Sequence, residues 1–390
     1  MMSVSTSGRL LPILAFCSFL VGFDAIATVP LLPEIAASTD MALKSGGLLY
    51  ASYAIAYALM APIMGNLSDR WNRKGILLIG IALFGISTAL VGFGKTTTEL
   101  ILYRILTGIG AGMIEPAVYA IAGDTYAYEQ RGRAMGVITA ALISSSVIGV
   151  PLAGMITEYV SWTWTFWIIA ILALIALAWA ILIIPNPRRD RHATAPSTQF
   201  IKVFMNSHVF ASLLASFLYF GALQGMFAIA GVFYFTFYGL GSGETGLLLM
   251  AAGASSIVGS LLGGKWADRY RKNRVVAIAS MLAGVFVFAL SLFTNNLWLS
   301  VLLHVMWAAL YAAGQSAFTA LVSELDPDSR GTVLSFNSSA MYIGASAASA
   351  TATVLLKSGS FWPIGLMCGM ANILVTLIVV FVIREKGAGQ

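Results

Sequence analysis

Residues 65–74 read GNLSDRWNRK and residues 264–273 read GKWADRYRKN, so two charged segments nearly repeat each other 199 positions apart. The same offset carries Arg131 onto Arg330, each followed by a glycine. Charged segments that keep one register in an otherwise apolar chain indicate an internal duplication. The sequence therefore predicts two homologous bundles of membrane helices.

The composition of the chain is that of a membrane protein. Of its 390 residues, 59% are hydrophobic and 10% are charged, and the mean hydropathy is +0.87. In a soluble domain about a quarter of the residues are charged. The net charge of +6 alone would suit nucleic-acid binding, but the basic residues lie in short clusters between apolar runs long enough to cross a bilayer. We therefore expect a multi-pass protein of the cell membrane that contacts the lipid bilayer and binds no nucleic acid.

Apolar runs bounded by Gly, Pro and charged residues predict an all-α fold with twelve membrane-spanning helices. The predicted spans are 10–32, 43–65, 75–94, 99–122, 134–157, 163–184, 208–237, 245–266, 275–293, 298–321, 332–356 and 363–383. A basic cluster and an Ala/Thr/Pro/Ser-rich stretch separate the sixth span from the seventh, a composition typical of flexible linkers. We accordingly predict an N-terminal six-helix bundle over 1–186, a cytoplasmic linker over 187–206 and a C-terminal six-helix bundle over 207–390.

The distribution of Lys and Arg predicts the orientation of the chain. With the N-terminus in the cytoplasm, 18 of the 22 Lys and Arg residues fall in cytoplasmic segments, and Arg104 lies inside a span. Lys44, Lys95 and Lys357 fall outside. Because cytoplasmic loops carry an excess of positive charge, both termini are predicted to be cytoplasmic.

Several segments resemble motifs of the major facilitator superfamily. Residues 65–74 are similar to its signature between the second and third helices, and residues 264–273 are a weaker copy between the eighth and ninth. Residues 100–111 have the spacing L-x-x-x-R-x-x-x-G-x-G-A, which resembles the fourth-helix motif of the proton-coupled drug exporters in that superfamily. Residues 129–136 resemble its loop between the fourth and fifth helices. The resemblance implies two pseudo-symmetric six-helix bundles and transport by alternating access.

Two positions depart from the pattern of the family. Asn72 stands where the loop signature usually has Gly, and Asn also adopts such a turn. The fifth-helix antiporter motif ends in Gly-Pro-x-x-Gly-Gly, whereas this chain reads GVPLAGM from Gly149, which keeps Pro151 and Gly154 but lacks two glycines. That motif accompanies proton-driven export. Its partial loss leaves open an importer or exporter of a specific solute such as a sugar, metabolite, siderophore or lipid.

The loop signature implies a cytoplasmic gate. In the family its carboxylate lies near a helix N-terminus, where the helix dipole favours an anion, and here Arg73 could bridge to Asp124 or Glu129. The alternative is that these charges only set the topology, but Lys and Arg alone would do that, and both copies contain an Asp. The predicted gate residues are Gly65, Asp69, Arg70, Arg73, Asp124, Arg131, Asp268 and Arg269.

Ionisable residues inside the spans are predicted to couple protons to transport. Asp24 lies in the first span and Arg104 and Glu115 in the fourth, where an unpartnered charge costs about 2.5–3.5 kcal/mol. Arg104 and Glu115 share a helix face but lie about 16 Å apart along the axis, so they cannot pair with each other. We expect Asp24 and Glu115 to carry protons, and Arg104 to tune a neighbouring carboxylate or to bind an anionic group. The alternatives are a helix-packing contact for Asp24 and a hydrogen bond at the kink made by Pro116 for Glu115.

Aromatic and polar residues are candidates for a substrate cavity. The resemblance implies that the first, fourth, seventh and tenth helices surround the cavity. Aromatic faces bind apolar and cationic groups without strict geometry, so such a set suits small amphipathic or drug-like molecules. Rows of aromatic and polar side chains along one face of a helix also occur in ordinary helix packing, and His304 could equally be a histidine of a helix interface. The predicted cavity residues are Tyr53, Tyr57, Gln224, His304, Trp307, Tyr311 and Gln315.

The sequence favours no enzymatic function. It contains neither metal-ligand spacings of His, Cys and acidic residues, nor a Ser/His/Asp arrangement, nor the Gly-Lys-Ser/Thr signature that holds nucleotide phosphates. We expect no enzyme activity, no catalytic residues, no metal and no cofactor. The expected partners are a small-molecule substrate, protons and the bilayer, with the protein acting as a monomer.

Small residues are predicted to let helices move. Gly108 and Gly112 have the spacing that permits close contact between membrane helices. We expect a large side chain at Gly112 to stall transport and leave folding intact.

Overall fold

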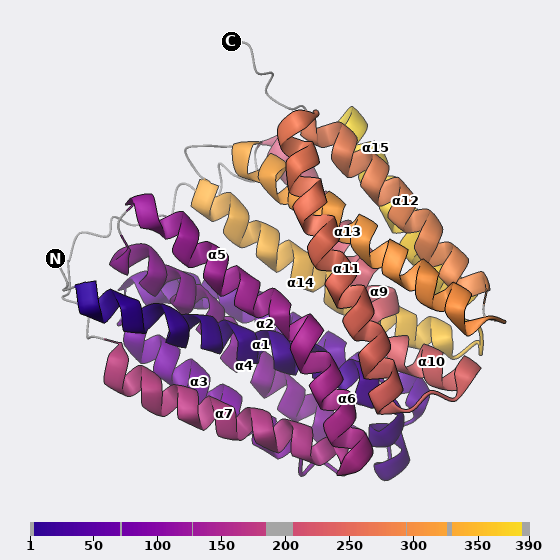
Figure 1. Cartoon of the computed structure of the whole chain (residues 1–390), viewed down its shortest axis with the longest axis horizontal. Helices are drawn as coiled ribbons and strands as arrows, with labels where there is room; N and C mark the ends of the chain where they lie inside the picture. The colour runs from indigo at the N-terminus through magenta and orange to yellow at the C-terminus, as the bar shows by residue number, and fades with distance from the viewer. Residues whose placement is uncertain are drawn as a thin grey trace. The chain divides into compact units, whose positions relative to one another are not determined.

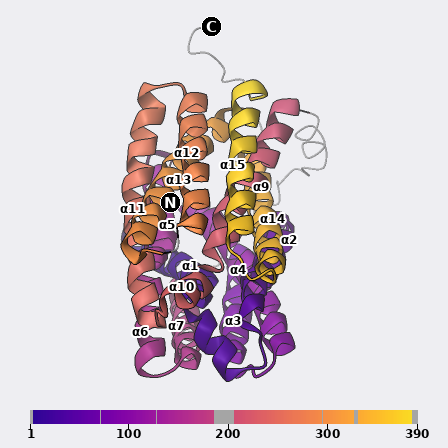
Figure 2. The same ribbon diagram turned by 90° about the vertical axis from the view of Figure 1, so that its right-hand side faces the viewer.

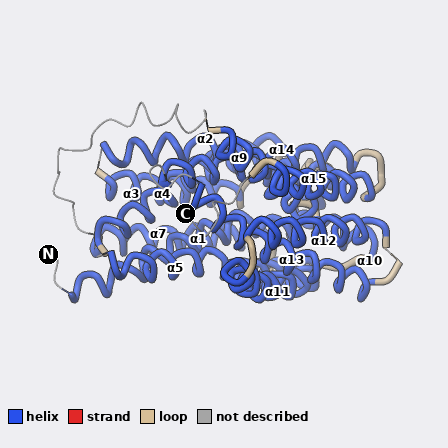
Figure 3. The backbone as a smooth tube through the Cα atoms, turned by 90° about the horizontal axis from the view of Figure 1, so that it is seen from above, coloured by secondary structure: helices blue, strands red, loops and turns tan. Residues whose placement is uncertain are grey.

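The computed structural model of the protein describes residues 4–70, 72–126, 128–184, 206–293, 295–325 and 330–383. For residues 4–9, 65–70, 128–133, 323, 330–332 and 334–335 the description covers the backbone alone. The described backbone consists of helices joined by short loops (Figure 3). Twelve helical stretches in these ranges are long and apolar enough to cross a membrane, which confirms the predicted fold class.

The chain divides into two compact units. Unit 1 comprises Met1–Thr194 together with Leu240–Leu247, and unit 2 comprises Ala195–Gly239 and Leu248–Gln390. Residues 240–247 therefore group with unit 1, although the sequence assigned them to the C-terminal bundle. Apart from Asn206, the predicted linker lies outside the described residues.

The helices of unit 1 pack around α1 and α4 (Figure 1). Its elements are α1 (Val4–Ser38), η1 (Leu43–Ser45), α2 (Gly47–Arg70), α3 (Arg73–Val91), α4 (Thr97–Thr125), α5 (Tyr128–Ser144), η2 (Ser145–Gly149), α6 (Val150–Tyr159) and α7 (Trp162–Ile183). Helix α4 packs against α2 and α3, while α1 packs against α5 and α7. The first residues of α11 also belong to this unit.

The helices of unit 2 pack as two connected groups, in which α9 contacts α14 and α15, and α12 contacts α13 and α15 (Figure 2). Its elements are α9 (Ser207–Phe227), α10 (Ala230–Tyr238), α11 (Ser242–Arg269), α12 (Lys272–Leu292), α13 (Leu297–Leu325), α14 (Arg330–Leu356) and α15 (Trp362–Phe381). The predicted seventh span is thus two helices, α9 and α10, which are interrupted at Ala228 and Ile229.

Side-chain caps define where several helices begin. Thr96 and Glu99 form a capping box at the start of α4, in which each side chain accepts a hydrogen bond from the backbone of the other. Asn72 caps α3, because its side-chain oxygen accepts from the backbone N–H groups of Lys74 and Gly75. The Asn that departs from the family pattern therefore supplies a helix cap and has an extended backbone conformation.

Glycines bring α2 and α4 into close contact. A Cβ on Gly108 would lie 3.0 Å from Ala56 Cβ, and a Cβ on Gly112 would lie 3.0 Å from Met60 Cβ. The close contact predicted from their spacing is therefore present, but it lies inside unit 1. Our expectation that a large side chain at Gly112 leaves folding intact is corrected accordingly, because such a side chain would push α2 away from α4.

Large apolar side chains lie on the outside of the helices. Leu182 of α7 is 82% exposed and Phe381 of α15 is 76% exposed. Soluble proteins rarely expose extended apolar surface, whereas the same side chains are well solvated by lipid. The surface therefore agrees with the twelve candidate spans in indicating a membrane environment.

Candidate functional site

A buried ion pair between α1 and α4 is the centre of the candidate site in unit 1. Arg104 Nη1 lies 2.6 Å from Asp24 Oδ2, and both side chains are fully buried. Charged residues are almost never fully buried unless they are paired. The sequence marked each residue as functional without identifying its partner, and the fold pairs them with each other.

Helices α2 and α3 complete the surroundings of this pair. Thr88 Oγ1 donates a hydrogen bond to Asp24 Oδ1 at 3.3 Å. Arg104 Nε donates to the Leu49 carbonyl at 3.4 Å, and the Arg104 guanidinium lies 4.5 Å from the ring centroid of Tyr53, within the range of a cation–π interaction. Arg104 Nη2 is buried and has no hydrogen-bond partner among the described residues. The guanidinium therefore retains a donor for a further acceptor.

The pair links the charge of Asp24 to the contact between two helices. Each buried ion has lost its hydration, and removing one partner leaves an uncompensated charge in an apolar environment. Protonation of Asp24 would remove the counter-charge of Arg104. A proton taken up at this carboxylate would thus weaken the interaction that holds α1 to α4.

Glu115 is a second buried carboxyl group of α4. It is 4% exposed and lies near Cys17 and Ser18 of α1 and near Tyr119, one turn farther along α4. Its Oε1 atom has no hydrogen-bond partner, and none of the ion pairs found among the described residues involves it. Since no described cation pairs with it, Glu115 can take a proton or the cationic group of a ligand.

A π-helical segment packs against α1 beside Asp24. The segment η2 (Ser145–Gly149) ends at Gly149, the first residue of the retained end of the fifth-helix motif, and Val150 N–H donates to the Ser145 carbonyl five residues earlier. Pro151 has no N–H for the Val147 carbonyl, which disfavours a regular α-helix at this position. A Cβ on Gly149 would lie 2.6 Å from the ring of Phe23, the residue before Asp24. The remnant of the antiporter motif therefore touches the helix that carries the buried carboxylate.

The predicted gate residues of unit 1 contribute one described ion pair. Arg73 at the start of α3 pairs with Asp124 at the end of α4, and it also donates to the Ala120 carbonyl at 3.0 Å. Of the two acidic partners expected for Arg73, the structure has Asp124, and Glu129 lies outside the described side chains. The side chains of Gly65, Asp69, Arg70 and Arg131 also lie outside them.

Unit 2 has an ion pair at the equivalent place. Lys272 at the start of α12 lies 3.2 Å from Glu324 near the end of α13, and Lys272 follows Arg73 by the repeat offset of 199. The duplicated sequence thus forms a similar contact in each unit. Asp268 and Arg269 are exposed at the end of α11, and the Arg269 guanidinium lies 5.8 Å from the ring of Tyr270.

The predicted cavity residues of unit 2 form a buried polar and aromatic network. His304 Nδ1 and the Tyr234 hydroxyl are 2.9 Å apart, and their rings are stacked. Trp307 is 1% exposed, its ring centroid lies 5.2 Å from that of His304, and its Nε1 has no hydrogen-bond partner among the described residues. His304 therefore interacts with both α10 and its own helix α13.

Farther along α13, Tyr311 and Gln315 interact directly. The Tyr311 hydroxyl donates to Gln315 Oε1 at 3.1 Å, and Gln315 Nε2 donates to Thr319 Oγ1 at 3.3 Å. Tyr219 of α9 donates to the Tyr311 carbonyl at 2.9 Å. Within the set predicted on the tenth span, one hydrogen bond therefore joins two members, Tyr311 and Gln315, while His304 bonds to α10.

The remaining predicted cavity residues are buried in their own units. In unit 1, Tyr53 and Tyr57 stack with ring centroids 6.5 Å apart, so the Tyr53 ring interacts with Tyr57 as well as with the Arg104 guanidinium. In unit 2, Gln224 lies near the break between α9 and α10, where Ser349 donates to the Gln224 carbonyl at 3.2 Å.

Sequence reasoning missed several polar residues that the fold places at these sites. Thr88 contacts Asp24, Ser18 lies beside Glu115, and Ser216 of α9 donates to the buried Asn337 of α14. Hydroxyl groups in helices often bond to the carbonyl of the preceding turn, so their presence in a span carries no signal of a long-range contact.

Comparisons with known proteins agree with this architecture. The model of the Major Facilitator Superfamily matches residues 14–349 and again 238–389. An uncharacterised MFS-type transporter of Bacillus subtilis, YceJ, is 27% identical over 92% of each chain. The quinolone resistance protein NorA of Staphylococcus aureus is 24% identical over 94% of this chain and 95% of that protein. Multidrug resistance protein 3 of B. subtilis is 25% identical over 74% of this chain and 68% of the relative.

A solved structure shares the fold over nearly the whole length. The crystal structure of a D-xylose-proton symporter superposes with a TM-score of 0.81 at 18% identity, covering 97% of this chain and 98% of that chain. At this identity the likeness shows the fold alone. The match of the family model, the twelve apolar helices and the duplicated loop motif agree with one another, and the chain belongs to the Major Facilitator Superfamily of multi-pass membrane transporters.

Proposed function

We propose that this protein is a proton-coupled exporter of small amphipathic or drug-like molecules that works by alternating access. The observation that carries the proposal is the buried Asp24–Arg104 pair between α1 and α4. Intramembrane ionisable residues mark ion and proton pathways in transporters. A carboxylate held by one guanidinium can exchange that partner for a proton when the site gains access to water.

The two carboxyl groups have different roles in this proposal. Asp24 has a cationic partner, so its protonation releases Arg104 and loosens the contact between α1 and α4. Glu115 has no such partner among the described residues, so it binds a proton without breaking an ion pair. Protonation of Asp24 therefore changes the contact between α1 and α4, whereas protonation of Glu115 breaks no ion pair between them.

The names of two relatives support small amphipathic or drug-like molecules as the substrate class. One is called a quinolone resistance protein and the other a multidrug resistance protein. The aromatic side chains around Arg104 and His304 would suit the apolar groups of such molecules. The competing proposal is transport of one specific solute, which the partial fifth-helix motif favours.

A transport assay tests the proposal. The purified protein is reconstituted in liposomes with an imposed pH gradient, and a library of amphipathic cations, neutral drugs, sugars and metabolites is screened for movement driven by the gradient. We expect amphipathic compounds to be transported, and a proton ionophore to abolish their transport. Transport of a single sugar or metabolite would support the competing proposal, and transport insensitive to the ionophore would contradict proton coupling.

Three isosteric variants assign the coupling residues. Asp24→Asn and Glu115→Gln are expected to abolish transport driven by the pH gradient, because neither amide can release a proton. Asp40→Asn is the matched control, since Asp40 is exposed and accepts a hydrogen bond from Thr97 at 3.0 Å that an amide oxygen can also accept. If both buried variants retain full gradient-driven flux, the assignment of the proton carriers is wrong.

A further inference from the structure

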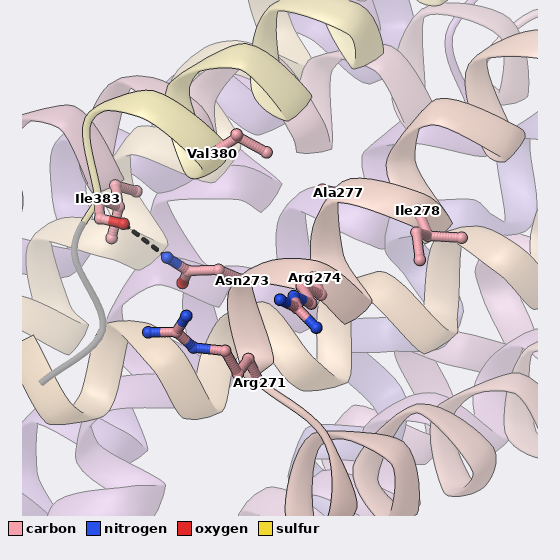
Figure 4. Close-up of a pocket in the computed structure, with 7 residues that line it drawn as sticks. All are labelled: Arg271, Asn273, Arg274, Ala277, Ile278, Val380 and Ile383. Carbon is pink, nitrogen blue, oxygen red and sulfur yellow. Dashed lines mark hydrogen bonds between the residues drawn. The ribbon is translucent and has the colours of Figure 1, made fainter. Parts of the chain in front are cut away.

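A cavity with a basic rim lies where α12 begins and α15 ends. Its volume is about 470 Å³, and it is lined by Arg271, Asn273, Arg274, Ala277, Ile278, Val380 and Ile383. Figure 4 shows the polar side chains of Arg271, Asn273 and Arg274 gathered at the first turn of α12, while Ile278 lies farther along that helix. Arg271 and Asn273 belong to the second copy of the loop motif, but none of the lining residues takes part in the ion pairs and networks described above.

The cavity combines two kinds of surface that meet at the edge of a bilayer. Its basic groups, Arg271 and Arg274, are exposed at the end of the helix, on the side that the charge distribution predicts to be cytoplasmic. Its apolar wall includes Ile278, which is 62% exposed, and Val380, which is 51% exposed. A ligand that fills it therefore needs a negatively charged group next to a hydrocarbon chain.

A comparison of the two copies of the duplicated sequence indicates that the basic end of the cavity lacks a side-chain acceptor to cap the start of α12. Asn72 caps α3 in unit 1 with its side-chain oxygen. The residue 199 positions later is Arg271, the N-cap of α12, and its side chain makes no capping hydrogen bond. An acceptor in the first copy is thus replaced by a cation in the second. The N-terminus of a helix attracts anions through its unpaired N–H groups and its dipole, and the replacement of Asn by Arg favours an external anion as the cap.

Asn273 adds a requirement for a hydrogen-bond donor. Its Nδ2 donates to the Ile383 carbonyl at 2.6 Å, which holds the start of α12 to the end of α15. Its Oδ1 is buried without a hydrogen-bond partner among the described residues. A buried acceptor left unpaired costs free energy, so a hydroxyl group on the ligand would complete the site. A headgroup ammonium would also donate, but the two arginines repel it.

We propose that this cavity binds the headgroup of an anionic, hydroxyl-bearing phospholipid such as phosphatidylglycerol. The phosphate lies between Arg271 and Arg274 at the N-terminus of α12, a headgroup hydroxyl donates to Asn273 Oδ1, and an acyl chain follows Ile278 and Val380 toward the hydrocarbon core. Arg suits this position because its planar guanidinium can bind phosphate oxygens in a bidentate manner. Basic pockets between membrane helices on the cytoplasmic side are a known type of anionic-lipid site.

The test measures lipid binding to the delipidated full-length protein by native mass spectrometry in detergent. The protein is titrated with phosphatidylglycerol and, in parallel, with phosphatidylcholine. We expect one phosphatidylglycerol to bind at concentrations at which phosphatidylcholine does not. Equal binding of the two lipids would overturn the proposal. Complete displacement of the lipid by millimolar inorganic phosphate would also overturn it, because the site would then bind the free anion.

Two double variants with equal loss of charge separate the cavity from general surface attraction. Arg271→Gln with Arg274→Gln removes the proposed phosphate ligands, and we expect binding to weaken about 10- to 30-fold, since one basic residue near a membrane surface contributes about fivefold. Lys265→Gln with Lys272→Gln is the control, because these residues lie in the same segment and do not line the cavity. An equal loss in both double variants would contradict a defined site.

A third variant tests the position of the headgroup. Asn273→Asp keeps the size of the side chain and adds a negative charge beside the proposed phosphate, so we expect phosphatidylglycerol binding to be lost. Thermal unfolding in detergent verifies that each variant is folded before its binding is compared. Binding of phosphatidylglycerol to a folded Asn273→Asp variant with unchanged affinity would contradict the proposed contact.

Discussion

At the scale of single residues, two charged side chains inside the predicted spans neutralise each other, because Asp24 pairs with Arg104. The two residues are 80 positions apart in the sequence, and their side chains meet at 2.6 Å in the fully buried interior of unit 1. Glu115 lies on the same helix as Arg104 and contacts different residues. One helix therefore carries two ionisable groups with different electrostatic surroundings.

The buried pair of Asp24 and Arg104 predicts how the free energy of unfolding changes when one or both partners are replaced. Arg104→Met should lower the free energy of unfolding by about 3–5 kcal/mol, because Asp24 would remain buried without its partner. Adding Asp24→Leu to Arg104→Met should recover most of this loss, since no charge then remains in the apolar interior. Thermal unfolding of both variants in detergent measures the difference. A double variant less stable than Arg104→Met would contradict an electrostatic origin.

At the scale of elements, the loop motif ties neighbouring helices together in both units. Arg73 joins α3 to α4, and Lys272 joins α12 to α13 at the equivalent place. Lys74 also donates to the Ile181 carbonyl of α7 at 2.9 Å. These contacts connect helix ends through exposed or half-buried charges, so their contribution to stability is small and their proposed role lies in gating.

A charge exchange between α3 and α4 tests the gating role. Asp124→Arg alone should reduce transport, because it places two cations opposite each other, and Arg73→Asp added to it should restore part of the transport. Stability should change little in either variant, since Asp124 is 56% exposed. Flux in liposomes and thermal unfolding are measured together. If Asp124→Arg transports as well as the wild type, the pair has no role in gating.

Alanine substitutions at two glycines, one at the contact between α2 and α4 and one on α5, should change stability in opposite directions. Gly108→Ala should destabilise unit 1, because the new Cβ would collide with the Tyr53 carbonyl and Ala56 of α2. Gly136→Ala should instead stabilise the protein by about 0.4–1 kcal/mol, because a Cβ there meets no atom within 4 Å and α5 gains a better helix former. Thermal unfolding in detergent compares the two. Equal shifts would contradict the close packing at Gly108.

At the scale of the whole molecule, the chain consists of two units built from one duplicated sequence. The hydropathy pattern alone predicted twelve spans, and twelve helical stretches satisfy the length and hydropathy of a membrane span. The irregular backbone inside two of the spans was not predicted from hydropathy. The break at Ala228 and the π-helical segment η2 lie inside continuous apolar runs, where hydropathy contains no information about local backbone hydrogen bonding.

The predicted orientation can be tested by labelling single cysteines in intact cells. Cys17 and Cys368 are buried, so they should not react with a maleimide that cannot cross the membrane. Lys95→Cys and Lys357→Cys should react from outside, whereas Lys265→Cys should react after the cells are opened. All three side chains are exposed. Labelling of Lys265→Cys in intact cells would contradict the cytoplasmic assignment of the loop motif.

The sequence by itself determined the environment, the number of spans and the duplication, because each depends on local composition or on similarity within the chain. It also marked Asp24, Arg104 and Glu115 as unusual, since a charge in an apolar span is costly wherever it lies. The tertiary structure decided that Arg104 pairs with Asp24, that Glu115 lacks a cation among the described residues, and that Arg271 and Arg274 line a cavity. These contacts join residues from different helices, and helix packing, which local sequence does not specify, determines which side chains meet.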